Sequence, residues 1–329
     1  MRILRSVPKA ADSSIALTIG NFDGVHLGHR AMLARLHVAA AERSLPACAM
    51  TFEPHPREFF APDQAPARLT SLREKLELLA AEGIARTYVC RFDYRFAQTP
   101  AEEFVEATLV RGLGARYVLV GDDFRFGARR AGDFALLERH AARLGYTVEA
   151  MSSVTLDAER VSSSAIREAL AGGDLARAAR LLGRHYSISG RVVSGDGLGR
   201  TLGFPTANVR MKHNRPPLAG IFAVEVTGAG GEVLRGVASL GVRPTVKQAA
   251  EPVLEVYLLD FSADLYGRHL RVDFLHKFRD EQKFADLDAL TAQIARDVED
   301  ARAFFAGEDA RLQKHKRRDA ATNMQVTNG

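Results

Sequence analysis

The sequence has 329 residues, of which 47% are hydrophobic, enough for about two domains of ~150 residues with cores of their own. No apolar run approaches the ~18 residues of a membrane span and the N-terminus lacks the apolar core of a signal peptide, so we expect a cytoplasmic protein without a membrane partner. The net charge of +5 suits small anionic ligands as well as larger ones, so it does not by itself indicate nucleic acid. Cys48 and Cys90 lie in apolar stretches without metal-like spacing and are expected to be buried thiols.

The first half of the chain alternates short β-type apolar runs with amphipathic stretches, from Ile15 to about Val154. This alternation predicts a Rossmann-like α/β domain, in which helices cover both faces of a parallel sheet. Ligands of such sheets bind beyond the carboxyl ends of the strands. Because the loops at 20–26, 52–56 and 121–127 each follow an apolar run, we expect them to converge on one edge of the sheet.

The pattern changes after two short helices expected within 163–183, which are hinged at Gly172 and Gly173 with Asp174 as a cap. The later runs show period-two alternation separated by glycine turns, which predicts an antiparallel β-barrel or sandwich closed by one amphipathic helix. A hairpin tip is expected at 228–231. The predicted parts are therefore an α/β domain at 1–183, a β domain at 184–306 and a disordered basic tail at 307–329.

The segment GNFDGVHLGH, residues 20–29, joins the first expected strand to a helix. Its glycines let a ligand approach the backbone, and the free N–H groups and dipole of the helix start favour a phosphate. His26 and His29 lie on one face of the first turn, where imidazoles can donate hydrogen bonds to phosphoryl oxygens during an in-line displacement. The segment therefore predicts a nucleotide site. Two alternatives stay open: His26 caps the turn while His29 packs, or the pair chelates a metal whose third ligand is not evident.

A run of serines flanked by arginines marks another helix start, in the segment RVSSSAIR at 160–167. The serines can act as a helix cap and nothing more. Hydroxyl groups, helix-start amides and guanidinium groups together also form a clamp suited to a triphosphate. We favour the clamp because three serines between two arginines exceed what a cap requires.

The motifs GxFDGxHxGH, FxPHP, GDDFxFG and xSSxxIR together resemble the adenylyltransferase module of bacterial bifunctional riboflavin kinase/FMN adenylyltransferases, also called FAD synthetases. The HxGH element is shared by nucleotidyltransferases generally. The resemblance implies transfer of AMP from ATP to the phosphate of FMN, which gives FAD and pyrophosphate. Since a phosphomonoester has its second pKa at about 6, the attacking oxygen is ionised at neutral pH and needs no general base. His26, His29 and Arg167 would then stabilise charge.

The same resemblance implies a flavin pocket at Pro54, His55 and Pro56. Asp123 departs from members that carry Asn there, and its carboxylate beside a polyphosphate would be repulsive unless Mg²⁺ intervenes or it contacts the adenosine instead. Ser164 departs from a frequent Thr but keeps the hydroxyl group. The residues that the resemblance assigns to ATP in this module are Gly20, Asn21, Phe22, Asp23, Gly28, Asp123, Arg160, Ser163 and Ser164.

The glycine-rich run at 195–211 is the second informative segment, although its glycines alone also fit a mobile loop. In GFPTAN, Pro205 fixes its own φ, and Thr206 and Asn208, two residues apart in an extended segment, point to the same side. A hydroxyl and an amide oxygen are ligands suited to Mg²⁺ that carries nucleotide phosphates. The spacing matches neither a Walker loop nor a Rossmann loop.

This run resembles the riboflavin kinase module of the same family, which implies that Thr206 and Asn208 hold Mg²⁺ and, with Gly203, ATP. The ribityl hydroxyl is about as weakly acidic as water, whose pKa is ~15.7, so its phosphorylation requires a base. The family expects a carboxylate on the opposite strand, and Glu255 matches that position. Alternation puts Leu254 in the core and Glu255 on the other face, whether that face meets solvent or a cleft.

The segment KFRDEQKF at 277–284 resembles the family segment before the last helix. If the resemblance holds, Arg279 and Glu281 border the flavin. The alternative is that they belong to a run of solvent-exposed charged residues. The complete hypothesis is an enzyme that converts riboflavin to FMN and FMN to FAD with Mg·ATP, as a monomer or weak homo-oligomer with small-molecule partners only. Two alternatives remain: a β domain that senses flavin without catalysis, and a nucleic-acid-binding protein that uses its KHKRR tail.

Overall fold

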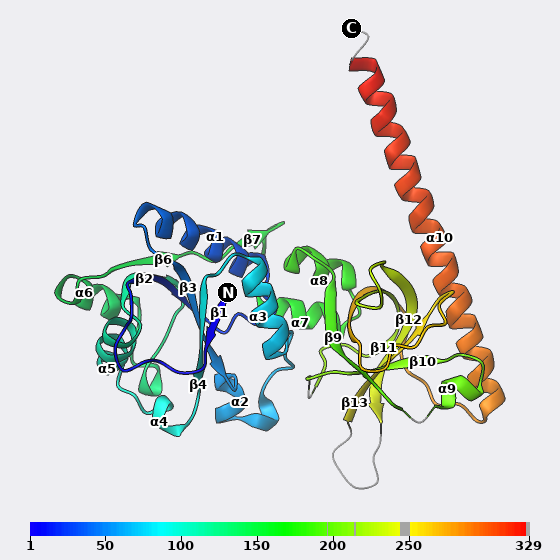
Figure 1. Cartoon of the computed structure of the whole chain (residues 1–329), viewed down its shortest axis with the longest axis horizontal. Helices are drawn as coiled ribbons and strands as arrows, with labels where there is room; N and C mark the ends of the chain where they lie inside the picture. The colour runs from blue at the N-terminus through cyan, green and yellow to red at the C-terminus, as the bar shows by residue number, and fades with distance from the viewer. Residues whose placement is uncertain (196, 214, 244–250, 327–329) are drawn as a thin grey trace. The chain divides into compact units, whose positions relative to one another are not determined.

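The computed structural model describes the backbone of residues 1–195, 197–213, 215–243 and 251–326, and side chains as far as Arg311 except at 242, 243 and 251. The chain divides into two compact units, residues 1–168 with 177–184 and residues 169–176 with 185–329 (Figure 1). The main division falls between Arg184 and His185, one residue beyond the boundary expected from the sequence. In the described part of the chain, no helix is long and apolar enough to cross a membrane.

The first unit is built on a six-stranded sheet in which all neighbouring strands are parallel, which confirms the predicted α/β fold. Such sheets are covered on both faces and their strands are almost continuously apolar. The strands lie in the order β1 (Arg2–Leu4), β4 (Arg86–Arg91), β3 (Ala47–Glu53), β2 (Ile15–Ile19), β5 (Ala115–Gly121) and β6 (Thr147–Met151).

Helices cover both faces of this sheet (Figure 1). All five residues of β2 are buried, and alternate ones enter different cores. Ala16 packs with α1 (Leu27–Glu42) and α3 (Leu72–Ala81), whereas Leu17 packs with the π-helical segment η2 (Phe104–Gly112) and α6 (Phe134–Leu144). The remaining short elements are α2 (Pro56–Phe60), η1 (Pro62–Gln64), α4 (Tyr94–Ala97), α5 (Ala101–Glu103), η3 (Ala128–Arg130), β7 (Thr155–Leu156), β8 (Glu159–Arg160), α7 (Ser163–Ala171) and α8 (Leu175–Leu182).

The predicted convergence of loops on one edge is confirmed by the strand order. Strands β3, β2 and β5 are adjacent and parallel, so the loops that follow them start at the same edge. The first loop is also tied to the end of β3, because Thr51 Oγ1 donates to the carbonyl oxygen of Asn21 at 3.2 Å. The two expected helices α7 and α8 are present as well, and Asp174 lies directly before α8.

The second unit contains a closed antiparallel barrel, which decides between the barrel and the sandwich left open by the sequence. The predicted hairpin tip at 228–231 is confirmed, since Val226 pairs with Leu234 across it. A short helix, α9 (Leu198–Thr201), lies in the glycine-rich run. The strands follow the order β10 (Thr206–Arg210), β13 (Glu251–Leu258), β12 (Leu234–Arg243), β11 (Gly220–Thr227), β14 (His269–Arg279) and β9 (Tyr186–Val193).

Helix α10 (Leu287–Val326) packs on the outside of the barrel through Val298, Ala301 and Phe305. It extends as far as Val326, through most of the segment expected to be disordered. Residues 308–326 contain no Gly or Pro and are rich in Ala, Arg, Lys and Gln, whose helix propensity needs no apolar periodicity. The side chains of the KHKRR stretch lie outside the described residues.

Both cysteines are buried as expected, with Cys48 0% and Cys90 2% exposed. Burial raises the pKa of the Cys48 thiol to about 11 and that of Cys90 to about 12. Neither thiol is therefore ionised at neutral pH, which fits a packing role.

Candidate functional site

The loop between β2 and α1 has an unusual backbone. Phe22, Gly24 and Val25 have φ values of 48°, 85° and 39°. At Gly24 the conformation and the space both require glycine, since a Cβ there would lie 2.8 Å from Leu69 Cδ1. At Val25 a β-branched residue in the left-handed region is a clear outlier, and such strain persists only where the surroundings impose it, often at functional sites.

The two histidines stack face to face at the start of α1, with ring centroids 3.7 Å apart and an interplanar angle of 18°. His26 is the N-cap of α1, because its Nδ1 accepts a hydrogen bond from the His29 backbone N–H at 3.3 Å. The capping alternative therefore holds for His26. With Nδ1 as acceptor, a neutral His26 carries its proton on Nε2, which is then a donor.

Both imidazoles are neutral at physiological pH. Burial, helped by the charges of Arg184 and Arg167, lowers the pKa of His26 to about 4, and burial also holds the pKa of His29 well below its usual value. The Nδ1 atom of His29 is buried and has no hydrogen-bond partner among the described residues. No cluster of three or more His, Cys, Asp or Glu that could hold a metal occurs in the described part of the chain, so the chelating alternative gains no third ligand.

Asp23 is turned into the protein. Its carboxylate accepts hydrogen bonds from the backbone N–H groups of Leu69 and Thr70 at 3.1 and 3.0 Å, and it pairs with Arg167 of α7 at 2.5 Å. Burial would raise the pKa of Asp23, but Arg167 and these amides hold it below its usual value. Asp23 thus ties the loop to the segment before α3 and to α7, a structural role that the sequence did not indicate.

The three serines at 162–164 have different surroundings. The Ser162 hydroxyl oxygen accepts from the Ala165 N–H at 3.2 Å and so forms the cap of α7, as the simpler alternative proposed. The Ser163 hydroxyl donates to the carbonyl oxygen of Asp23 at 2.9 Å, whereas Ser164 is exposed. The start of α7 is therefore anchored to the first loop.

Asp123 has a partner that removes the expected repulsion. Its carboxylate lies 2.7 Å from the Arg160 guanidinium, and both side chains are exposed. The pair is neutral overall, so a polyphosphate near this edge would not meet an uncompensated carboxylate. An exposed pair of this kind is easily exchanged for another anion because it contributes only about 0–1 kcal/mol.

The FEPHP segment forms a rigid turn at the end of β3. His55 Nδ1 accepts from the Arg57 N–H at 3.1 Å and caps α2, while Glu58 accepts from the His55 N–H at 3.2 Å. Burial lowers the pKa of His55 to about 4. Beside this turn lies a cluster of aromatic rings that the sequence reasoning missed although REFF follows directly: Phe52, Phe59, Phe60, Phe92 and Phe96.

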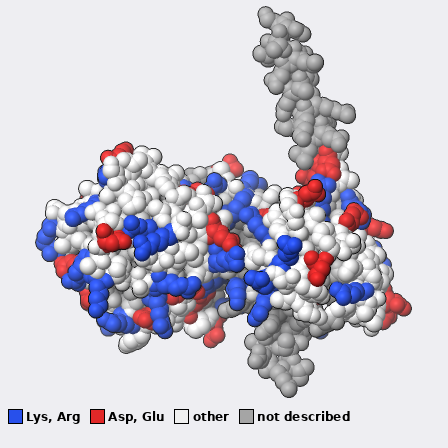
Figure 2. Space-filling model, in the orientation of Figure 1, with Lys and Arg blue, Asp and Glu red and all other residues white. Residues whose placement is uncertain are grey.

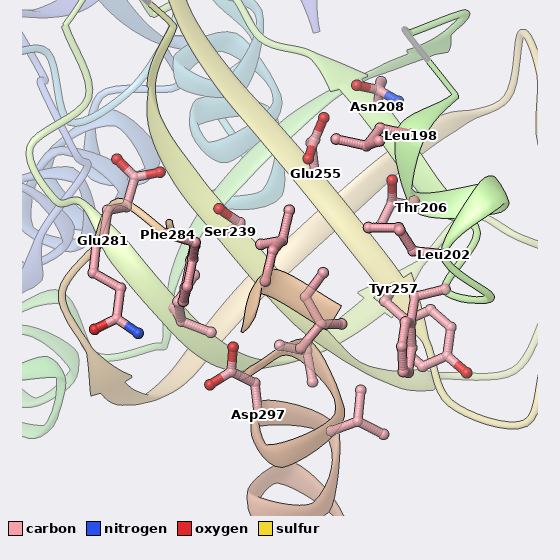
Figure 3. Close-up of a pocket in the computed structure, with 18 of the residues that line it drawn as sticks. Leu198, Leu202, Thr206, Asn208, Ser239, Glu255, Tyr257, Glu281, Phe284 and Asp297 are labelled. Carbon is pink, nitrogen blue, oxygen red and sulfur yellow. The ribbon is translucent and has the colours of Figure 1, made fainter. Parts of the chain in front are cut away.

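The second unit contains a cavity of about 400 Å³ between the outer face of the barrel and α10 (Figure 3). Five of the predicted site residues line it, from three strands and the segment before α10; Gly203 does not line it. These residues are Thr206, Asn208, Glu255, Arg279 and Glu281.

The barrel register explains how these side chains meet. Asn208 pairs with Glu255, Glu255 with Ser239, Ser239 with Ile221, and Ile221 with Arg279. Directly paired residues present their side chains on the same face, so this row crosses five strands along the cavity wall. Ser239, which no motif indicated, is the cross-strand partner of Glu255 and also lines the cavity (Figure 3).

Glu255 faces the cavity rather than open solvent. Leu254 and Val256 on either side of it are 0% exposed, and Leu258 is 5% exposed, as the alternation predicted. Glu255 and Tyr257 both line the cavity. This arrangement removes the alternative of an ordinary surface residue for Glu255.

Arg279 and Glu281 line the same cavity and so are not a plain solvated charge run. The Arg279 guanidinium makes two hydrogen bonds to Asp297 of α10, at 2.8 and 2.6 Å, and Asp297 is 3% exposed. A Cβ at Gly241 would collide with the Glu281 carboxylate, so that glycine gives the carboxylate its place. Arg279 therefore joins β14 to α10 at one wall of the cavity.

Glycines in the run at 195–211 have a steric reason. A Cβ at Gly195 would collide with the Asn208 side-chain amide, and one at Gly199 would lie 3.2 Å from Thr206 Oγ1. A second cavity, of about 550 Å³, lies beside the first and shares Thr206 with it. It is lined among others by Arg200 and Tyr266. Thr206 thus stands between two cavities that could hold two ligands.

Comparison with known proteins agrees with this division into two sites. A family model described as FAD synthetase matches residues 8–165, and one described as riboflavin kinase matches residues 182–305. The bifunctional riboflavin kinase/FMN adenylyltransferase of Escherichia coli (strain K12) is 50% identical over 305 residues, covering 93% of this chain and 97% of its own. That of Haemophilus influenzae is 49% identical over 290 residues, covering 88% and 94%.

A crystal structure described as a macrolide-efflux protein from Streptococcus pneumoniae superposes with a TM-score of 0.78 at 29% identity, covering 92% of this chain and 99% of that chain. The two family models account for both units in order, and the curated relatives align over nearly the whole length. The chain therefore belongs to the bifunctional riboflavin kinase/FMN adenylyltransferase family.

Proposed function

We propose that the second unit phosphorylates riboflavin to FMN with ATP and that the first unit adenylylates FMN to FAD with release of pyrophosphate. The observation that carries this proposal is the convergence of Thr206, Asn208 and Glu255 on one cavity of the barrel, together with the histidine pair at the start of α1. Two chemically different sites in one chain fit two consecutive transfers.

In the kinase step, Glu255 takes the proton of the ribityl 5′-hydroxyl, whose oxygen then attacks the γ-phosphorus of ATP; the bond to the β-phosphate oxygen breaks and ADP leaves. Ser239, the cross-strand partner of Glu255, adds a hydroxyl donor to the wall of the same cavity. We place riboflavin in the cavity under α10, where Phe284 and Leu290 offer apolar surface. ATP occupies the adjoining cavity on the other side of Thr206.

The donor set beside Glu255 fits Mg²⁺. The Thr206 hydroxyl and the Asn208 amide stand two residues apart on the same face of β10, and both are hard oxygen ligands. When bound there, Mg²⁺ would neutralise charge on the nucleotide phosphates. Gly195 and Gly199 let the glycine-rich run approach the Asn208 and Thr206 side chains closely, so the polypeptide fixes the direction in which these two side chains point.

In the adenylyl step, an ionised FMN phosphate oxygen attacks the α-phosphorus of ATP, and the bond to the β-phosphate oxygen breaks. The Leu27 and Gly28 N–H groups, at the first turn of α1, and His26 Nε2–H donate to the phosphoryl oxygens as charge builds up. Because the imidazoles are neutral, they act as donors and not as acids. Ser164 lies at the start of α7, Arg167 follows one turn later where it pairs with Asp23, and Arg160 can exchange Asp123 for a phosphate.

The flavin ring of FMN binds against the turn Pro54–Pro56 and the adjoining aromatic cluster. We propose a cytoplasmic enzyme with small-molecule partners, active as a monomer or weak homo-oligomer. On the face shown in Figure 2, acidic and basic side chains are interspersed. Such a mixed surface fits small-molecule partners better than a nucleic-acid partner, which favours a continuous basic surface.

The test is product analysis with the full chain, riboflavin, ATP and Mg²⁺, by chromatography of the flavins. We expect FMN first and FAD later. Glu255→Gln should abolish FMN formation while FMN supplied directly is still converted to FAD. The flavin-sensor alternative would be supported instead if the wild-type chain forms no FMN and Glu255→Gln still binds riboflavin with wild-type affinity.

A further inference from the structure

Arg184, the last residue of the first unit, is bound to the loop between β2 and α1. Its Nη2 donates to the carbonyl oxygen of Gly24 at 2.6 Å, and its Nη1 donates to that of Val25 at 3.1 Å. The same Nη1 lies 3.4 Å from the carbonyl oxygen of Leu182, at the end of α8. One guanidinium group therefore joins two consecutive carbonyl groups of the loop to the end of α8.

These two carbonyl groups belong to the strained part of the loop. Gly24 and Val25 have φ values of 85° and 39°. A left-handed backbone at a valine persists only where neighbouring groups hold it. The fork of an arginine can hold two acceptors at once in a fixed geometry, which a lysine cannot. Arg184 is placed to hold the strained turn.

The start of α1 depends on this turn. Leu27 and Gly28 are the first residues of α1, and their N–H groups have no partner inside the helix. His26, which caps the helix, directly follows Val25. The backbone directions of Gly24 and Val25 therefore set where these donors point.

We propose that Arg184 is a positioning residue for adenylyl transfer: by holding the carbonyl groups of Gly24 and Val25, it keeps His26 and the start of α1 in the geometry that receives the polyphosphate of ATP. This inference rests on the function proposed for the first unit and adds a residue to it. The motifs of that unit end at Arg167, and the boundary expected after Gly183 assigned Arg184 to the other domain.

Arg184 also acts on the histidine pair through its charge. It lowers the pKa of His26 and of His29, in addition to the burial that lowers both most. Loss of its charge should raise the pKa of both imidazoles. The other groups that act on them are Asp23, which raises the pKa of His26, and Arg167, which lowers it. Lys75 and His26 lower the pKa of His29.

The test uses the full chain with Arg184→Ala and Arg184→Lys. The matched control is Arg116→Ala, because Arg116 also donates to a backbone carbonyl, that of Gly145 at 2.8 Å, but stands at the amino end of β5, away from the loop. For each variant the rate of FAD formation from FMN, the rate of FMN formation from riboflavin, and the thermal midpoint are measured.

We expect Arg184→Ala to lower kcat for FAD formation by about 10–100-fold, since small displacements of catalytic donors cost that much. The loss should fall on kcat more than on KM, because the donors act on charge that develops in the transition state. The acid limb of the pH profile should move to higher pH. Arg184→Lys should be intermediate, added guanidinium should restore part of the rate to Arg184→Ala, and FMN formation and Arg116→Ala should match wild type.

Wild-type FAD formation by Arg184→Ala would overturn the inference. An equal loss in Arg184→Ala and Arg184→Lys, with a lower thermal midpoint and an unshifted pH profile, would also overturn it, because it would show a role in stability alone. If the wild-type chain forms no FAD at all, the proposed function fails first, so the two failures are distinguishable.

Discussion

The buried pair of Asp23 and Arg167 allows a sharp test of how the first site is held together. In Asp23→Asn one carboxylate oxygen becomes an NH₂ group. Both carboxylate oxygens receive donors, since Leu69 N–H approaches each of them and Arg167 and Thr70 approach one each. Whichever way the amide is turned, a donor will face a donor, and the Arg167 guanidinium loses its buried counter-ion.

The expected cost follows from burial. Asp23 is 4% exposed and the Arg167 side chain 16%, so water cannot replace the lost partner. Removing one member of a buried pair costs about 3–5 kcal/mol. For a unit of this size each kcal/mol corresponds to about 2–4 °C, so the thermal midpoint of the first unit should fall by roughly 6–20 °C.

The control is Asp123→Asn, which removes the same charge from a pair whose side chains are 58% and 70% exposed. An exposed pair contributes about 0–1 kcal/mol, so its midpoint should change by a few degrees at most. Calorimetry of the full chain measures both variants, and kinase activity reports on the second unit. Equal midpoints for Asp23→Asn and Asp123→Asn would refute the structural role of Asp23.

Asp297→Asn should weaken the docking of α10 by about 3–5 kcal/mol and raise KM for riboflavin, because it leaves the paired arginine without its buried counter-ion. Urea unfolding and initial rates measure this, and an unchanged KM would contradict it. Gly195→Ala should slow the kinase and leave FAD formation from FMN intact, because its Cβ collides with the Asn208 amide; an unaffected kinase rate would count against that amide as a ligand. The first unit should lose stability as the pH falls from about 6.5 towards 4, since unfolded histidine titrates near ~6.5 and the unfolded chain binds more protons in this window. The folded pKa of His26 and of His55 is about 4; a thermal midpoint that stays flat across this window would disprove it.

Local patterns in the sequence were sufficient for both fold classes and for much of the second site. Period-two alternation placed Leu254 and Val256 in the core and Glu255 on the other face, and the structure confirms this. The side-chain period of a strand depends only on its own residues, so it can be read without knowing the partners. The alternation cannot say what covers the other face, and only the packing of α10 made that face a cavity.

The first site shows where local reasoning stops. Asp23 binds Leu69, 46 residues away, and Arg184 binds Val25, 159 residues away. The sequence around either residue does not specify such partners, because the strand order and the packing of α8 bring them together only in the folded chain. His26 was correctly placed at a helix start, but its capping bond depends on the rotamer that the surrounding packing allows.

The sequence by itself therefore determined the main strands and helices, the α/β class of the first unit, the antiparallel β class of the second and the residue types available for phosphate chemistry, because propensity and periodicity act between near neighbours. The tertiary structure alone decided which of those residues face a ligand and which hold the loops, because burial and long-range hydrogen bonds exist only after the chain has closed. Asp23 and Ser239 are examples: a motif aspartate is a structural anchor, and a serine outside every motif is the cross-strand partner of Glu255 in the cavity wall.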